Sequence, residues 1–105
     1  MEYVLILSTI GTEADAHTVA EKLITSKNAA CVNIIPGIQS VYEWKGKQCN
    51  DSELMLIIKT TKNKEKDVYK IIKDTHPYET PEIISLPIQH GSKDYLNWIS
   101  ASVKS

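Results

Sequence analysis

The sequence predicts an α+β fold in which two crossover helices cover one face of a four-stranded antiparallel sheet, the ferredoxin-like plan. Strand-like and helix-like segments alternate in the order βαββαβ, a long β-hairpin lies in the middle of the chain, and a short helix follows the last strand. The length of 105 residues is typical of one compact domain. We therefore expect a single domain that covers residues 1–105.

The first strand and the first helix have clear local signals. Residues 3–7 are apolar at odd and even positions alike, which is typical of a central strand that is buried on both faces. Thr12 and Asp15 have the spacing of an N-terminal capping box, and Asn28 is expected to end the helix in the left-handed conformation. The expected buried stripe of this helix consists of Ala16, Val19, Ala20, Leu23 and Ile24.

Residues 30–60 predict a long antiparallel hairpin with its turn at residues 45–46. Counting back from this turn pairs the apolar Val32 with a lysine, which mixes charged and apolar side chains on one face. One extra residue at Pro36-Gly37 places Val32 beside Ile58 instead. The sequence therefore predicts a β-bulge at this position.

The C-terminal half completes the alternation of elements. Residues 63–76 predict a second helix that Pro77 ends, and residues 82–88 predict a strand that Pro87 confines to an edge of the sheet or to a break in it. Ser92 is expected to cap the final helix. The buried stripe of the second helix comprises Val68, Ile71, Ile72 and Thr75, and that of the final helix comprises Tyr95, Leu96, Trp98 and Ile99.

Two features of this plan predict a homo-oligomer. Helices on one face leave the other face of the sheet uncovered, although its residues are apolar. Hairpin arms of about fifteen residues reach about 50 Å, roughly twice the length of the first strand, so the tip overhangs. The overhang carries Ile38, Val41, Tyr42 and Trp44. Because a monomer would expose this surface to water, we expect sheets that pack together and hairpins that contact neighbouring subunits.

The charges and the cysteines limit the classes of partner. All 12 basic residues are lysines and they face 13 acidic residues, which leaves a net charge of -1 and no clustered basic surface for nucleic acid. The apolar run 3–7 is too short for a signal peptide or a membrane span. Cys31 and Cys49 are expected about 11 residues apart along the hairpin, too far to bridge within one subunit. We expect a cytoplasmic protein with free thiols, no nucleic-acid partner and no membrane partner.

Residues 76–81, His-Pro-Tyr-Glu-Thr-Pro, hold the most concentrated chemistry in the chain. His76 is a candidate ligand for a soft or borderline divalent ion, with Glu79 as a hard partner. The alternative interpretation is that His76 only ends the second helix and that Tyr78 packs at an interface. Since the sequence contains no glycine-rich phosphate loop and no Gly-x-Ser-x-Gly turn, we expect a protein that is not an enzyme.

Short motifs in a fixed order cover nearly the whole chain. They are Ala30-Cys31-Val32-Asn33, Pro36-Gly37-Ile38, Ser40-Val41-Tyr42-Glu43-Trp44-Lys45-Gly46-Lys47, Ile58-Lys59-Thr60, His76-Pro77-Tyr78-Glu79, Pro81-Glu82-Ile83-Ile84 and Tyr95-Leu96-Asn97-Trp98-Ile99. Together these motifs resemble the CutA divalent-ion tolerance proteins. The resemblance implies a ferredoxin-like subunit in a homotrimer, similar in plan to the PII signalling proteins, and a role in tolerance to copper and other divalent ions.

The resemblance also bears on the candidate metal site. In bacterial members of the family, copper has been assigned to a cysteine that ends the first strand and to two histidines just before the Pro-Tyr pair. The matching positions in this chain are Ser8, Thr75 and His76, so this chain shares one ligand of that set, His76. Replacement of the thiolate removes the ligand that favours soft copper.

Two hypotheses about function follow. The first is a non-enzymatic homotrimer that binds copper, another divalent metal ion or a small ligand in inter-subunit clefts, with His76 as the metal ligand and Tyr78, Glu79 and Lys59 as ligand-binding residues. The second is a PII-like sensor that binds a nucleotide or a small anion between subunits and acts on a partner protein. Clefts lined by Lys59 and by backbone N–H groups would favour the sensor.

Overall fold

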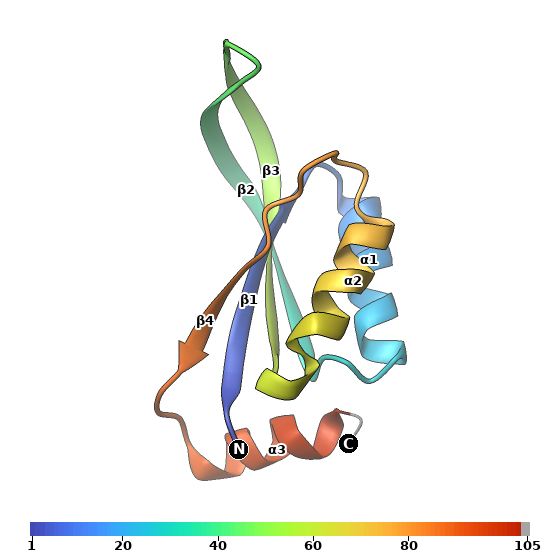
Figure 1. Cartoon of the computed structure of the whole chain (residues 1–105), viewed down its shortest axis with the longest axis vertical. Helices are drawn as coiled ribbons and strands as arrows, with labels where there is room; N and C mark the ends of the chain where they lie inside the picture. The colour runs from blue at the N-terminus through green and yellow to red at the C-terminus, as the bar shows by residue number, and fades with distance from the viewer. Residues whose placement is uncertain (104–105) are drawn as a thin grey trace.

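The computed structural model describes residues 1–103 and has the predicted ferredoxin-like order of elements (Figure 1). The elements are β1 (Tyr3–Ile10), α1 (Glu13–Thr25), β2 (Cys31–Trp44), β3 (Lys47–Thr61), a 3₁₀ turn η1 (Lys62–Lys64), α2 (Glu65–Thr75), β4 (Ile84–Ile88) and α3 (Lys93–Ser102). None of the helices in this described part combines the length and the apolar character that crossing a bilayer requires.

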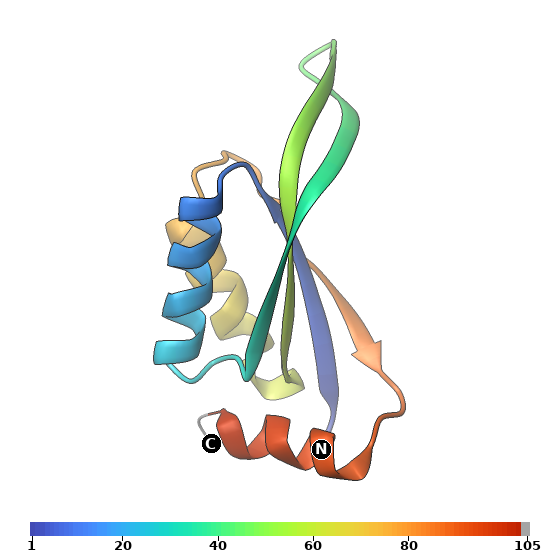
Figure 2. The same cartoon turned by 180° about the vertical axis from the view of Figure 1, so that it is seen from behind.

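The four strands form one antiparallel sheet in the order β2-β3-β1-β4. β1 is central, as predicted, and extends to Ile10, past its apolar run 3–7. β4 is an edge strand in which Pro87 lies opposite Val4. α1 and α2 lie together on one face of the sheet, and α3 runs across the end of the sheet beside the N-terminus (Figures 1 and 2). The described helices therefore leave the other face of the sheet open.

The core lies between the sheet and the pair α1 and α2. Side chains alternate along a strand, so every second residue of β1 and β3 points into this layer and the others face the open side. The fully buried apolar side chains of the layer are Ile6, Ile10, Ala16, Val19, Leu23, Leu56, Ile58, Val68 and Ile72. Burial of one such side chain contributes about 1.5–3 kcal/mol, so this layer is a major source of folding free energy.

The hairpin contains the predicted bulge. The pairing of β2 with β3 shifts between Ile35 and Ile38, and Val32 lies opposite Ile58. Gly37 has a φ of 79°, a left-handed conformation that glycine adopts at no steric cost. The extra residue thus keeps the apolar side chains of the proximal half on the core side, as the sequence predicts.

The tip of the hairpin is a two-residue turn. Lys45 and Gly46 both have positive φ angles, 52° and 80°, as a type I′ turn requires. The distal half of the hairpin extends beyond the other elements of a subunit whose longest dimension is 45 Å (Figures 1 and 2). Cys31 and Cys49 are free and lie opposite Lys59 and Tyr42 respectively, as predicted.

The C-terminus of α1 differs from the prediction by one residue. Lys27, and not Asn28, takes the left-handed conformation, with a φ of 60°. The N–H groups of Lys27 and Asn28 donate to the carbonyls of Ile24 and Leu23, which are the two hydrogen bonds of a Schellman motif. The carbonyl of Asn28 accepts a hydrogen bond from the buried hydroxyl of Thr60 at 2.6 Å, so Asn28 joins the loop to β3.

Three side chains that were expected on buried stripes are exposed. Ile24 of α1 is 42% exposed, and Tyr95 and Trp98 of α3 are 41% and 46% exposed. Helical spacing identifies an apolar stripe, but the width of the packed face depends on the surface that the helix meets. Because α3 crosses the end of the sheet, it buries Ile99 and leaves its aromatic side chains on the surface of the single subunit.

The hydroxyl of Ser8 provides a test of the core. It is fully buried on β1 and, among residues 1–103, is the one buried side-chain polar atom without a hydrogen-bond partner. Removing an unpartnered buried hydroxyl removes its desolvation cost, so Ser8→Ala is expected to raise the free energy of unfolding by up to about 1 kcal/mol. Urea unfolding at one fixed protein concentration measures this change.

Thr60→Val is the matched control for Ser8→Ala. The hydroxyl of Thr60 is equally buried but donates to the carbonyl of Asn28. Its removal leaves that carbonyl unpaired and is expected to lower the free energy of unfolding by about 1–3 kcal/mol. A lower unfolding midpoint for Ser8→Ala would show that the hydroxyl of Ser8 is partnered after all.

Candidate functional site

A cleft of about 630 Å³ lies between the distal half of the hairpin and the loop of residues 76–83 that joins α2 to β4. The end of β1, both strands of the hairpin and this loop meet at the base of the overhang (Figure 1). The lining residues are Thr9, Ser40, Val41, Tyr42, Trp44, Asp51, Glu53, Tyr78, Glu79, Thr80 and Glu82. The predicted ligand-binding residues Tyr78 and Glu79 are thus together in one cleft.

The register of the strands places this cleft on the helix-free side of the sheet. Asp51 and Glu53 are two residues apart on β3, so they share a face, and the buried Leu54 next to them points to the core side. Ser40 lies opposite Asp51, beyond the bulge. Thr9 alternates in the same way with core-facing neighbours on β1. A second subunit that packs on the open sheet face would therefore border the cleft.

His76 fixes the loop that forms one wall of the cleft. It is 7% exposed, and its Nε2 atom lies 2.6 Å from the carbonyl oxygen of Thr9. Because a carbonyl only accepts, Nε2 carries the proton and Nδ1 accepts the backbone N–H of Tyr78 at 3.1 Å. The rings of His76 and Tyr78 pack edge to face, with centroids 4.6 Å apart. Both nitrogens of the predicted metal ligand are therefore used within the subunit.

Tyr78 connects the loop to the hairpin. Its hydroxyl donates to Oε2 of Glu53 at 2.7 Å. Burial and this hydrogen bond to a carboxylate both raise the pKa of Tyr78 above its ordinary value, so the phenol stays protonated and remains a donor. Glu53 itself is 6% exposed although it carries a carboxylate. Glu53 carries no distinguishing signal in the sequence, because a carboxylate on a hairpin resembles a residue of a solvated face.

Tyr42 and Asp51 form a second pair of a phenol and a carboxylate. The hydroxyl of Tyr42 on β2 donates to Oδ2 of Asp51 on β3. This hydrogen bond is the main cause that raises the pKa of Tyr42 to about 12. A neighbouring cross-strand bond, from the amide of Gln39 to the hydroxyl of Ser52 at 2.8 Å, further defines the hairpin at this level. Two phenols are thus oriented by carboxylates in the same cleft.

The rim of the cleft contains a charged contact between the hairpin tip and the loop. Nζ of Lys45 lies 3.9 Å from Oε1 of Glu79 and 5.7 Å from the ring centroid of Trp44. Both charged side chains are largely exposed, so this contact is weak. It nevertheless shows that the rim of the cleft can hold an ammonium group.

Lys59 lies apart from this cleft in the single subunit. It pairs with Leu5 and Cys31 at the other end of β3, six residues and so about 20 Å from Glu53 along the strand. Its ammonium lies 5.6 Å from the ring centroid of Tyr95 on α3. The structure therefore brings Tyr78 and Glu79 together but does not add Lys59 to them.

The three positions that the resemblance relates to copper already have roles within the subunit or are buried in it. Ser8 is fully buried, the hydroxyl of Thr75 donates to the carbonyl of Ile71 at 2.6 Å, and His76 makes the two bonds described above. Within residues 1–103, no group of three or more His, Cys, Asp or Glu side chains is arranged to hold a metal ion. A metal at His76 would have to displace one of its hydrogen bonds.

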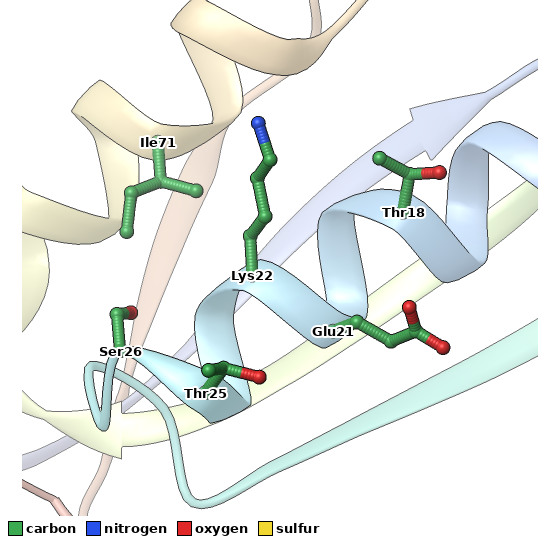
Figure 3. Close-up of a pocket in the computed structure, with 6 residues that line it drawn as sticks. All are labelled: Thr18, Glu21, Lys22, Thr25, Ser26 and Ile71. Atoms are coloured by element: carbon green, nitrogen blue, oxygen red, sulfur yellow. The ribbon is translucent and has the colours of Figure 1, made fainter.

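A second and more open groove, of about 560 Å³, lies between α1 and α2 (Figure 3). In Figure 3, Lys22 extends toward α2, where Ile71 lies, and Glu21 points away from it. Both charged side chains are exposed, and no aromatic residue is among the residues that line the groove. This groove lacks the buried charge that distinguishes the first cleft.

The fold and the cleft define a class of protein: small ferredoxin-like subunits with an overhanging hairpin that forms a ligand-sized cleft with the loop after the second helix. Residues 4–102 match the model of a family described as CutA1 divalent ion tolerance protein. The chain belongs to this family. The family is one of divalent-cation tolerance proteins and is not a known family of enzymes.

Individual relatives agree with this assignment. The divalent-cation tolerance protein CutA of Citrobacter koseri is 41% identical over 103 residues, which are 98% of this chain and 90% of that protein. The CutA1 structure from Oryza sativa is 38% identical, covers 99% of this chain and 95% of its own, and superposes with a TM-score of 0.96. The divalent cation tolerance protein of Thermus thermophilus is 39% identical and has a TM-score of 0.94. The match covers 97% of this chain and 99% of that one.

The pair of Tyr42 and Asp51 predicts a pH dependence of stability. A phenol whose pKa is raised from 10 to about 12 by folding contributes stability that is fully present below pH 10 and is lost as the pH rises to 12. The urea midpoint of the unmodified protein is therefore expected to fall more steeply between pH 10 and pH 12 than that of Tyr42→Phe. In Asp51→Asn, tyrosinate absorbance should develop at lower pH than in the unmodified protein. Urea midpoints that fall equally steeply with pH in Tyr42→Phe and in the unmodified protein would contradict the role of this hydrogen bond.

Proposed function

We propose that the protein is a non-enzymatic, cytoplasmic homotrimer that contributes to divalent-cation tolerance by binding a cationic ligand, a metal ion or a small molecule, in the cleft between the hairpin and the loop 76–83. Membership of the family supports the tolerance role. The observation that carries the binding role is the charge of the cleft. Its lining within the described chain contains no lysine and has four carboxylates, those of Asp51, Glu53, Glu79 and Glu82. A concave surface of one sign concentrates ions of the opposite sign.

The same charge argues against the PII-like anion sensor at this cleft. A nucleotide or a small anion would approach carboxylates instead of cationic groups. Lys59, the residue expected to hold such an anion, lies at the other end of β3. The sequence also contains no arginine for a bidentate contact with phosphate. A cation-binding role is better supported by this geometry.

Assembly into a homotrimer is supported by the apolar surface that one subunit leaves uncovered. The exposed large side chains include Ile35, Val41, Trp44, Ile84, Leu86, Tyr95 and Trp98. They lie on the hairpin, on the edge strand β4 and on α3, outside the core layer that α1 and α2 cover. An exposed apolar surface that spans several elements is typical of an interface. The resemblance in sequence implies that three subunits share it.

Native mass spectrometry of the reduced protein measures the number of subunits and the number of bound metal ions together. We expect a complex of three times the chain mass of 11.8 kDa. Copper(II) or zinc is expected to add in steps up to three per trimer with low affinity, because the carboxylates attract divalent ions without forming a ready-made ligand cluster. Glu53→Gln is expected to reduce this uptake, and Glu43→Gln, on an exposed part of β2 outside the cleft lining, is the charge-matched control.

His76→Ala separates the cleft from the metal site predicted at His76. Metal uptake that survives in His76→Ala and is reduced in Glu53→Gln supports the cleft. Uptake that is lost in His76→Ala and retained in Glu53→Gln would move the site to His76 and overturn the cleft as the metal site. A monomer at micromolar concentration would overturn the proposed assembly.

A further inference from the structure

Glu53 gives the cleft a largely buried carboxylate that has no cationic partner within the described chain. The residue is 6% exposed, and no ion pair among residues 1–103 includes it. The described hydrogen bond to its side chain comes from the hydroxyl of Tyr78 and reaches Oε2 only. Withdrawing a carboxylate from water without a counter-charge is unfavourable. Since Glu53 lines the cleft, a cation bound there would supply the missing charge.

Lys45 places an ammonium group at the rim of the cleft. Its ammonium is near both a carboxylate and an aromatic ring, 3.9 Å from Oε1 of Glu79 and 5.7 Å from the ring centroid of Trp44. These two groups together are the usual surroundings of a bound organic ammonium. In the interior of the cleft a carboxylate also lies next to an aromatic residue, because Glu53 accepts a hydrogen bond from the hydroxyl of Tyr78.

Building on the cation-binding role proposed above, we propose that the ligand of this cleft is an aliphatic amine in its ammonium form. Its ammonium group contacts the carboxylate of Glu53, and its alkyl part packs against the aromatic rings of Tyr42 and Tyr78. At the rim, the ligand competes with the ammonium of Lys45 for Glu79. The ligand class is therefore a small organic cation.

The geometry favours an organic ammonium over a bare metal ion as the preferred ligand. The cleft measures about 630 Å³, which suits a small molecule and far exceeds one ion. Zinc and copper(II) take about four convergent protein ligands, and Mg²⁺ and Ca²⁺ take six or more oxygen atoms. An ammonium requires up to three acceptors and gains further from aromatic faces. Within residues 1–103, no metal-ligating group of three or more side chains is present.

Isothermal titration calorimetry of the intact assembly with butane-1,4-diamine tests the proposal. The neutral butane-1,4-diol, at the same ionic strength, has the same length without the charges. We expect saturable binding of the diamine and none of the diol. Glu53→Gln, which keeps an acceptor for Tyr78, should weaken diamine binding by about tenfold or more. Glu43→Gln should leave it unchanged, and native mass spectrometry should show the same assembly for each variant.

Lys45→Asn is a second variant, and it is expected to strengthen diamine binding instead of weakening it. Asparagine tolerates the left-handed conformation of this turn position, and Asn-Gly favours a type I′ turn, so the hairpin should fold normally. Because the ammonium of Lys45 no longer competes for Glu79, diamine binding should become about threefold stronger. Lys47→Asn, which removes an equal charge from the other side of the turn, should not strengthen it.

The outcomes separate this inference from the proposed function. Diamine binding that is unaffected by Glu53→Gln, or that the diol matches, overturns the amine ligand. Divalent-ion binding that Glu53→Gln weakens, together with no diamine binding, overturns the amine ligand and leaves the cation-binding role intact. If neither the diamine nor the divalent ions bind at this cleft, the amine ligand and the cation-binding role are both overturned.

Discussion

The register shift at residues 36–37 is the constraint on which the hairpin depends. The type I′ turn fixes the distal half, in which Tyr42 faces the same side as Asp51. Simple continuation of that register would turn the apolar Val32 away from the core. The extra residue restores Val32 to the position opposite Ile58. One hairpin can therefore contribute its proximal half to the core and its distal half to the wall of a polar cleft.

The opposite wall depends on His76. Its two hydrogen bonds, to the end of β1 and to the backbone of Tyr78, hold the loop against the sheet and orient the phenol toward Glu53. Histidine suits this position because its neutral ring both donates and accepts in one plane. Metal binding by His76 stays a prediction, and in this conformation it competes with the bonds that shape the cleft.

Much of the fold could be predicted because its signals are local. The patterns of apolar residues, a capping pair and prolines specify the strands, the helices and even the bulge within a few neighbouring positions. The site could be predicted only in part, because its contacts are distant in sequence: Thr9 and His76 are 67 residues apart, and Glu53 and Tyr78 are 25 apart. The exposure of Trp98 likewise depends on where α3 meets the sheet, which its own periodicity does not encode.

The two contacts that span the cleft differ in strength, and this difference bears on how a ligand enters. The hydrogen bond from Tyr78 to Glu53 is partly buried and charge-assisted, so breaking it is costly. Lys45 and Glu79 are mostly exposed, and a surface pair of this kind contributes about 0–1 kcal/mol. Replacement of Lys45 by another cation at Glu79 therefore costs the protein little stability. The hydrogen bond from Tyr78 to Glu53 still holds the interior of the cleft in shape. Breaking the contact at the rim requires the movement of one long, exposed side chain.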